Sequence, residues 1–360
     1  MSETLSTNLR FGWTTGTCAT AGVIASYTAL MTKEFPKNVK IETPSGKVAE
    51  LAVESSELTE NSAISGIIKD AGDDPDVTHG ALILAELSFG KTGQGVRFLR
   101  GKGVGEITKP GLPIAVGEPA INPVPRQMMI KAITDLSEAL GGPSDVDITI
   151  HVKDGEAIAE KTWNPRLGIM GGISILGTSG VVRPFSCAAW IASIHRGIDV
   201  ARANGCDHVL GATGNQSEAL AKSLYDFEDI ACLDMGDFVG GLLKYLRRHP
   251  LPFLTLSGGF AKFTKLAQGA VDLHSARSQI DFTLLAEWAA ECGMPYDKVA
   301  SANTALEVLT LADDAQAQKL AQLIAQKSHQ KVKEILRDAP VRVEIMLVRR
   351  DGTLLCRHKG

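Results

Sequence analysis

The sequence predicts a mixed fold of two domains, an N-terminal α+β domain and a C-terminal α/β domain with a doubly wound parallel sheet. Three observations lead to this expectation. A chain of 360 residues exceeds what one core usually serves, since domains average about 150 residues. Strand-like runs cluster with few helices in the first half, whereas strands and helices alternate in the second. We expect domains at 1–180 and 181–340, and a C-terminal hairpin at 341–360 that could join either domain.

The first half is expected to open with a helix over 14–31, followed mainly by strands. Cys18, Gly22, Ala25 and Ala29 recur at helical spacing, so a sheet or a ligand can approach this face closely. Cys18 in the first helical turn is either a small core residue or a thiolate activated by the helix dipole. The remaining elements are strands 39–42, 48–53, 64–69, 81–87, 96–99 and 146–152, and a helix over 126–140 that ends at two glycines.

The second half alternates between the two types of element, which predicts a parallel, doubly wound, Rossmann-like sheet. Strands are expected at 207–210, 230–233 and 253–256, with helices at 186–204, 215–225 and 237–248. Helices 284–291, 303–311 and 314–337 follow, and a hairpin at 341–348 and 354–356 closes the chain.

The composition excludes several classes of protein. With 44% hydrophobic and 22% charged residues, the chain is an ordinary folded protein. A formal net charge of −4 provides no overall basic field for nucleic acid. The six cysteines are widely separated and form no CxxC pair, so we expect no metal site and no disulfide framework.

Membrane association is also not expected. Residues 11–32 are uncharged and long enough to span a bilayer, but they include six threonines, three glycines and a serine. The polar residues 1–10 lack the apolar core of a signal peptide, so we expect a cytoplasmic protein.

Polar and glycine-rich turns follow the strands of the second half. Gly211-Ala-Thr-Gly214 opens a predicted helix in which Asn215 and Glu218 fit a capping box. Doubly wound sheets bind ligands at the carboxyl ends of their strands, where an acidic residue bonds ribose hydroxyls. These turns outline a pocket for an adenosine-type ligand, with ordinary α/β turns as the alternative; its residues are Gly211, Thr213, Gly214, Asp234, Ser257 and Gly258.

A ten-residue segment, Asp70-Ala-Gly-Asp-Asp-Pro-Asp-Val-Thr-His79, concentrates negative charge. Carboxylates this close repel, so at least one pKa should rise unless a cation or backbone amides compensate. The spacing does not fit a calcium loop, which leaves general-base chemistry or an Asx-rich turn. We expect Asp70 and Asp73 to be catalytic because they flank Gly72, where the backbone can approach a flat ligand. His274 is a further candidate for acid–base chemistry.

Four basic residues stand out as anion ligands, although each could also be a solvated surface charge. Arg126 and Arg166 follow prolines at the rims of turns, where guanidinium groups can bind carboxylates in bidentate fashion. Lys262 and Lys265 lie just beyond the third predicted strand of the second half. By contrast, Gly101-Lys-Gly-Val-Gly105 fails the GxGxxG pattern at Glu106 and predicts a glycine hairpin or bulge.

Motifs along most of the chain resemble those of the CbiD family, cobalt-precorrin-5B C(1)-methyltransferases of anaerobic-type cobalamin biosynthesis. They include Thr14-Thr-Gly-Thr-Cys-Ala19, the Asp70–Thr78 segment, Val116-Gly-Glu-Pro-Ala-Ile-Asn-Pro-Val-Pro-Arg126, Asn164-Pro-Arg-Leu-Gly168, Gly171-Gly-Ile-Ser-Ile-Leu-Gly-Thr178, Thr213-Gly214 and Lys265-Leu-Ala267.

The resemblance implies S-adenosyl-L-methionine as methyl donor and a cobalt-bearing corrinoid as acceptor, methylated at carbon 1 to give cobalt-precorrin-6A. The cobalt then arrives with the substrate, and the product is handed over to neighbouring enzymes of the pathway. We expect the acceptor to be bound by Thr14, Thr15, Thr17, Arg126, Arg166, Lys262 and Lys265. Two alternatives are a hydrolase acting on a corrinoid intermediate, using Cys18 or a loop carboxylate, and a non-catalytic tetrapyrrole-binding protein.

Overall fold

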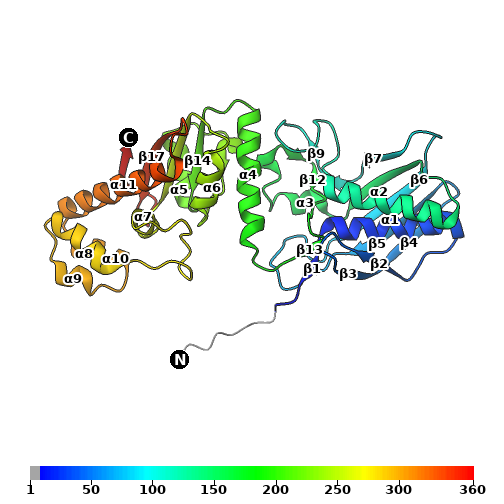
Figure 1. Cartoon of the computed structure of the whole chain (residues 1–360), viewed down its shortest axis with the longest axis horizontal. Helices are drawn as coiled ribbons and strands as arrows, with labels where there is room; N and C mark the ends of the chain where they lie inside the picture. Colours follow the sequence, from blue (N-terminus) through cyan, green and yellow to red (C-terminus); the bar gives the residue numbers. More distant parts are fainter. Residues whose placement is uncertain (1–8) are drawn as a thin grey trace. The chain divides into compact units, whose positions relative to one another are not determined.

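The computed structural model describes residues 9–360, which fold as a mixed α/β protein of two compact units (Figure 1). The first unit ends at Ser186 and the second spans Cys187–Gly360. Within the described residues, no helix has both the length and the apolar character needed to cross a membrane.

A five-stranded sheet forms the centre of the first unit. Its order is β4-β5-β6-β10-β7, with antiparallel neighbours except for the parallel pair β10 and β7. Beside it, β2 (Asn38–Glu42) and β3 (Val48–Ala52) form an antiparallel hairpin. The strands of the main sheet are β4 (Ser55–Leu58), β5 (Ser62–Ile68), β6 (Leu82–Phe89), β7 (Val96–Arg100) and β10 (Val146–Val152).

Two long helices, α1 (Thr15–Thr32) and α2 (Pro123–Leu140), lie side by side in this unit (Figure 1). Helix α1 also packs on β5 and β6. A β-carbon at Gly22 would lie only 2.8 Å from the Ala85 side chain, so the helix approaches the sheet as closely as its small residues allow. The expected close packing of this helix face on a sheet is therefore confirmed.

Three pairs of short strands join residues 169–182 to residues 12–13 and 103–107. They pair as β8 with β12, β9 with β11, and β1 with β13. Gly103 has a φ of +77°, and a β-carbon there would lie 2.1 Å from the Val152 carbonyl oxygen, so the GKGVG segment is a close backbone crossing. The elements concerned are β1 (Gly12–Trp13), β8 (Gly103–Val104), β9 (Glu106–Ile107), α3 (Gly155–Ala159), β11 (Ile169–Met170), β12 (Gly172–Ile173) and β13 (Val181–Val182).

The second unit is built on another five-stranded sheet, of order β15-β14-β16-β17-β18. Its first four strands are parallel, and β18 is antiparallel to β17, which places the closing hairpin in this sheet. The strands are β14 (His208–Ala212), β15 (Cys232–Leu233), β16 (Phe253–Gly259), β17 (Arg342–Val348) and β18 (Leu354–Lys359).

The helices of this unit follow the expected positions, with α7 and α9 in addition. Expected strand 230–233 shortens to β15, because residues 229–231 form a 3-10 turn. The helices are α4 (Cys187–Ala203), α5 (Asn215–Leu224), α6 (Val239–Leu246), α7 (Phe260–Ala267), α8 (Phe282–Glu291), α9 (Tyr296–Ala300), α10 (Ala305–Leu311) and α11 (Asp314–Leu336).

The expected capping box at α5 is wrong. Gly214, not Asn215, is the N-cap residue, and it makes no side-chain cap bond. Asn215 is already helical, and the Ser217 hydroxyl donates to the Gly214 carbonyl at 2.7 Å. Gly214 has an extended conformation, with φ of 165° and ψ of 171°, between the end of β14 and the first residue of α5.

Candidate functional site

The carboxyl ends of β14 and β16 lie next to each other and carry the turns that the sequence singles out. Ala212 pairs with Ser257, and the chain leaves β14 towards β15 on one side but leaves β16 towards β17 on the other. Such a reversal of direction opens a crevice between two crossover connections, where α/β sheets bind ligands.

The two turns are tightly joined but keep an open backbone surface. Thr213 donates its N–H to the Ser257 carbonyl at 2.9 Å, and a β-carbon at Gly258 would lie 2.4 Å from the Thr213 hydroxyl oxygen. By contrast, β-carbons at Gly214 and Gly259 would meet no atom within 4 Å. Gly214 and Gly259 therefore leave room for a ligand to approach the main chain.

Not every predicted residue of this pocket faces that open surface. Ser257 is buried, and its hydroxyl donates to the Ser217 carbonyl at 2.9 Å. Gly211 lies inside β14, where a β-carbon would come within 2.9 Å of the Leu256 side chain. Asp234 directly follows β15, whose register sets Leu233 beside Gly211. Gly211 and Ser257 therefore hold the turns in place, whereas Asp234 lies at the edge of the sheet.

The two lysines of this unit make short contacts within it. Lys262 donates to the Thr213 carbonyl at 3.1 Å and lies 2.9 Å from the Asp237 carboxylate. Lys265 is buried and donates to the Leu273 carbonyl at 3.0 Å, and burial lowers the pKa of its ammonium group. Lys262 remains partly exposed at the sheet edge, whereas Lys265 holds the segment after α7 and offers no exposed ammonium to a substrate.

His274 lies in a turn of the second unit that fixes its tautomer. Its Nδ1 accepts the Ala276 N–H at 3.2 Å, so the neutral ring carries its proton on Nε2. Asp272 accepts the His274 N–H and binds the Arg277 guanidinium. As a result, neutral His274 presents a hydrogen-bond donor at Nε2 rather than a base.

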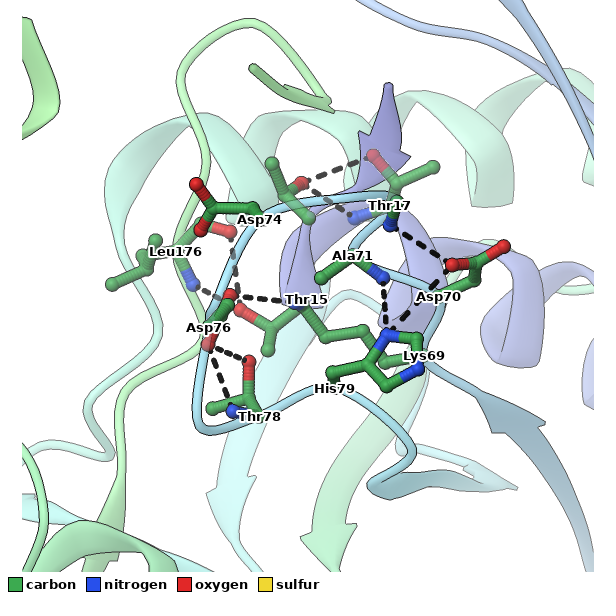
Figure 2. Close-up of polar contacts among 12 residues, drawn as sticks. Thr15, Thr17, Lys69, Asp70, Ala71, Asp74, Asp76, Thr78, His79 and Leu176 are labelled. Atoms are coloured by element: carbon green, nitrogen blue, oxygen red, sulfur yellow. Dashed lines mark hydrogen bonds and ion pairs between the residues drawn. The ribbon is translucent and has the colours of Figure 1, made fainter. Parts of the chain in front are cut away.

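The Asp-rich loop of the first unit is compensated by cations, as Figure 2 shows in part. Asp70 makes a two-pronged contact with Arg10 and accepts the Gly72 N–H at 2.9 Å. The hydrogen bonds and charge of Arg10 hold the pKa of Asp70 below its usual value. The pKa of Asp70 is therefore not raised, because a cation and a backbone amide compensate its negative charge.

The chain itself fills the approach expected for a flat ligand at Gly72. Gly72 has a φ of +69°, and a β-carbon there would lie 2.2 Å from the Arg10 carbonyl oxygen. Phe11 forms a β-bridge with Gly72, and Asp73 exchanges hydrogen bonds with the Arg10 backbone at 2.6 and 3.0 Å. The expectation for Gly72 is therefore wrong, because residues 10–12 occupy this position.

Lys69 is the buried charge at the centre of the loop (Figure 2). It is 1% exposed, and its Nζ lies 2.7 Å from Asp76 Oδ2, while Asp76 Oδ1 accepts the Thr78 N–H and hydroxyl. Burial raises the pKa of Asp76, but Lys69 and Thr78 outweigh it, so the net pKa is lowered. The sequence offered no signal for this pair, because a lysine at the end of a strand usually reaches solvent.

The threonines at the start of α1 hold the segment 176–180. The Thr15 hydroxyl accepts the Leu176 N–H at 2.9 Å and donates to the Leu176 carbonyl at 3.2 Å (Figure 2). The Thr17 hydroxyl donates to the Gly180 carbonyl at 2.7 Å, and Thr14 caps the helix. All three are buried, so the structure gives them internal partners instead of an exposed surface for substrate.

Cys18 is a core residue. Its side chain is fully buried, and burial raises the pKa of the thiol to about 12. Of the two interpretations of Cys18, the core residue is confirmed and the thiolate is not, because the cost of burying the charge exceeds the effect of the helix dipole.

The two arginines of the first unit differ in their surroundings. Arg126 donates to the Ile121 carbonyl at 2.8 Å and to Glu118 at 3.1 Å, and thereby holds the turn before α2. Arg166 stacks over the ring of Trp163 at 4.5 Å. Arg166, Trp163 and Lys161 line a surface hollow of about 320 Å³ that also contains Glu160 and Thr162, whereas Arg126 lies outside it. The hollow adds Trp163 and Lys161 to the residues that the sequence suggested.

Residues 9–360 hold no group of three or more His, Cys, Asp or Glu side chains placed to bind a metal ion. The comparisons with known proteins agree with the motifs. The family model described as CbiD matches residues 2–184, and that described as CbiD, C-terminal domain, matches residues 272–359.

Curated relatives match over almost the whole chain. A protein of Brucella anthropi named cobalt-precorrin-5B C(1)-methyltransferase is 56% identical over 97% of this chain and 95% of its own length. Proteins of the same name from Brucella canis and Brucella suis are 55% identical over the same shares. A 1.9 Å crystal structure of the cobalamin biosynthesis protein cbiD from Archaeoglobus fulgidus matches with 26% identity and a TM-score of 0.41, covering 75% of this chain and 83% of its own.

The fold defines a two-unit α/β protein with polar and glycine-rich turns at the carboxyl ends of parallel strands. On the family model and the relatives, the chain belongs to the CbiD family.

Replacing Asp76 with Asn should lower the free energy of unfolding at pH 7 by roughly 3 kcal/mol, because Lys69 stays buried without a carboxylate. The lowered pKa of Asp76 means that its stabilising contribution is complete above about pH 4 and is lost as the pH falls through the folded-state value. Urea unfolding at pH 7 and at lower pH measures both effects.

Asp135→Asn is the matched control, because Asp135 pairs with Lys131 on an exposed helix face. It should leave the unfolding midpoint nearly unchanged. If Asp76→Asn unfolds like this control at pH 7, the buried pair does not stabilise the loop.

Proposed function

We propose that this chain is a cobalt-precorrin-5B C(1)-methyltransferase that uses S-adenosyl-L-methionine and forms cobalt-precorrin-6A in cobalamin biosynthesis. The observation that carries the proposal is the 56% identity over 97% of the chain to a relative of that name. The strand order of the second sheet and the open backbone at Gly214 and Gly259 also support it, because an adenosine-bearing methyl donor suits the carboxyl ends of such strands.

The second unit is the part that we assign to the donor, as a Rossmann-like doubly wound domain. Its strand order begins β15-β14-β16-β17, so successive crossovers run first one way and then the other. Since crossovers between parallel strands are right-handed, α5 and α6 fall on opposite faces of the sheet. A sheet whose two faces are both covered by such crossover helices is called doubly wound.

The residues at this edge fit the groups of the donor. The Asp234 carboxylate suits the ribose hydroxyls, and the open backbone at Gly214 and Gly259 admits close contact. The N-cap residue Gly214 makes no side-chain bond to the helix, and the N–H groups of the first turn of α5 suit the carboxylate of the donor. When bound, S-adenosyl-L-methionine supplies a methyl group on a positively charged sulfur.

The hollow around Arg166 is the surface that we assign to the acceptor. Corrinoid precursors carry several carboxylate side chains around a large macrocycle. Arg166 and Lys161 provide cations for the carboxylates, and Trp163 provides an apolar face. The cobalt belongs to the substrate and needs no ligands from this chain.

Proton removal from the methylated macrocycle is the remaining chemical task. When a ring carbon accepts a methyl cation, the macrocycle gains one positive charge. Loss of a proton from the macrocycle removes that charge. Asp70 is a weak base because its pKa is lowered, and neutral His274 carries its proton on Nε2. Asp73 is the exposed carboxylate of the loop and is the base that we propose.

The hydrolase alternative loses its thiol nucleophile, since Cys18 is buried with a raised pKa. The cytoplasmic location and the hand-over to neighbouring enzymes stay predictions.

The function is tested by incubating the purified protein with cobalt-precorrin-5B and S-adenosyl-L-methionine labelled in its methyl group. We expect the label at carbon 1 of the product, located by NMR. A protein that binds the corrinoid without transferring label is a tetrapyrrole carrier, and turnover that does not require the donor indicates a hydrolase.

Replacing Asp73 with Asn should lower single-turnover methylation by about 10²–10⁴-fold if the carboxylate accepts the proton. Affinity for S-adenosylhomocysteine should not change. Asp74→Asn is the control, because Asp74 accepts the Phe185 N–H at 2.8 Å, a contact that Asn preserves. Normal turnover by a folded Asp73→Asn protein removes Asp73 from the mechanism.

Replacing Arg166 with Lys should weaken binding of cobalt-precorrin-5B by about 1–2 kcal/mol, since lysine keeps the charge but loses the planar fork and its stacking on Trp163. Absorbance titration without donor measures this affinity. Arg126→Lys should instead reduce thermal stability and leave binding close to wild type, because its partners are internal. The opposite pattern would reverse the two assignments.

A further inference from the structure

Trp190, on α4, is an aromatic side chain with a fixed orientation at the edge of the second sheet. Its indole Nε1 donates to the Asp234 carbonyl at 2.9 Å, immediately after β15. An indole has only two side-chain torsions, so one hydrogen bond to the main chain is enough to hold the plane of its ring.

The main chain after β15 also supports this ring. Gly236 has a φ of +53°, and a β-carbon there would lie 3.3 Å from the Trp190 ring. Phe238 packs against the same indole with a centroid distance of 6.0 Å and an angle of 53°. Trp190 nevertheless stays 46% exposed, so it keeps a large apolar surface in contact with solvent.

The Trp190 ring is linked through Gly236 to the end of β14, where the turn into α5 begins. Gly236 donates its N–H to the Ala212 carbonyl, the last residue of β14, at 3.1 Å. The indole is therefore connected through Gly236 to Ala212 and through its own N–H to Asp234. Ala212 and Asp234 lie at the ends of β14 and β15, whose turns carry residues that we assign to the methyl donor.

The other tryptophans do not share these properties. Trp288 is buried, Trp13 packs against the core of the first unit, and Trp163 carries Arg166 over its ring. A rigid, exposed aromatic ring at a sheet edge costs little conformational entropy when it stacks on a planar group, because its orientation is already set.

We propose that the Trp190 indole forms one wall of the donor site and stacks on the adenine ring of S-adenosyl-L-methionine. This proposal rests on the proposed function and adds a specificity-determining residue to it. Adenine is the flat, π-bonded part of the donor. The Asp234 carboxylate is assigned to the ribose, and the carbonyl of the same residue holds the indole.

The test measures binding of S-adenosylhomocysteine, the demethylated donor, by calorimetry with the full chain. Trp190→Ala should weaken binding by about three- to tenfold, whereas Trp190→Phe, which keeps an aromatic face, should retain most of the affinity. A role limited to the indole N–H would weaken both variants alike, because neither can donate to the Asp234 carbonyl.

Tryptophan fluorescence provides a second readout. S-adenosylhomocysteine should quench the emission of the wild type and of Trp13→Phe, because Trp13 packs against the core of the first unit and is assigned to neither ligand. The quenching should be lost in Trp190→Phe. Circular dichroism and the melting temperature confirm that each variant is folded.

The outcomes separate this proposal from the proposed function. Unchanged affinity in Trp190→Ala, or quenching that persists in Trp190→Phe, overturns the stacking role alone. A loss of corrinoid affinity with normal donor affinity also overturns it, since the macrocycle would then be the group on Trp190. No binding of S-adenosylhomocysteine to the wild type overturns both this proposal and the choice of donor.

Discussion

A lysine that is 1% exposed needs a carboxylate beside it, and this requirement organises the polar end of the first unit. Lys69 holds Asp76, and Asp76 in turn receives both hydrogen bonds of Thr78, which closes the Asp-rich loop. The loop then presents Asp70 and Asp73 to Arg10, so residues 10–12 are bound along it. Removing either charge of the buried pair would leave the other without compensation in a low-dielectric interior.

The second unit depends on a different constraint, the reversal of chain direction between β14 and β16. Because parallel strands end at one edge, the turns after β14, β15 and β16 gather there. Backbone hydrogen bonds from Gly236 to Ala212 and from Thr213 to Ser257 join those turns into one surface. Glycines at 214 and 259 leave that surface open, and Trp190 and Lys262 reach it from α4 and α7.

The family and the activity followed from motifs that are long and unusual in composition, and the comparisons bear them out. Roles of single residues were harder to predict. Thr15, Cys18 and Lys265 belong to distinctive motifs, yet all three are buried with internal roles. A motif marks residues that a family needs, but it does not distinguish those that contact a substrate from those that hold the fold.

The sequence by itself determined the order and type of most elements, because hydrophobic periodicity and glycine or proline at turns act over a few residues. It also determined which strand ends carry polar turns. Only the tertiary structure decided the strand order, the pairing of Lys69 with Asp76 and the contact of Trp190 with Asp234. These depend on long-range packing, in which residues far apart in sequence meet and burial changes the cost of every charge and hydrogen bond.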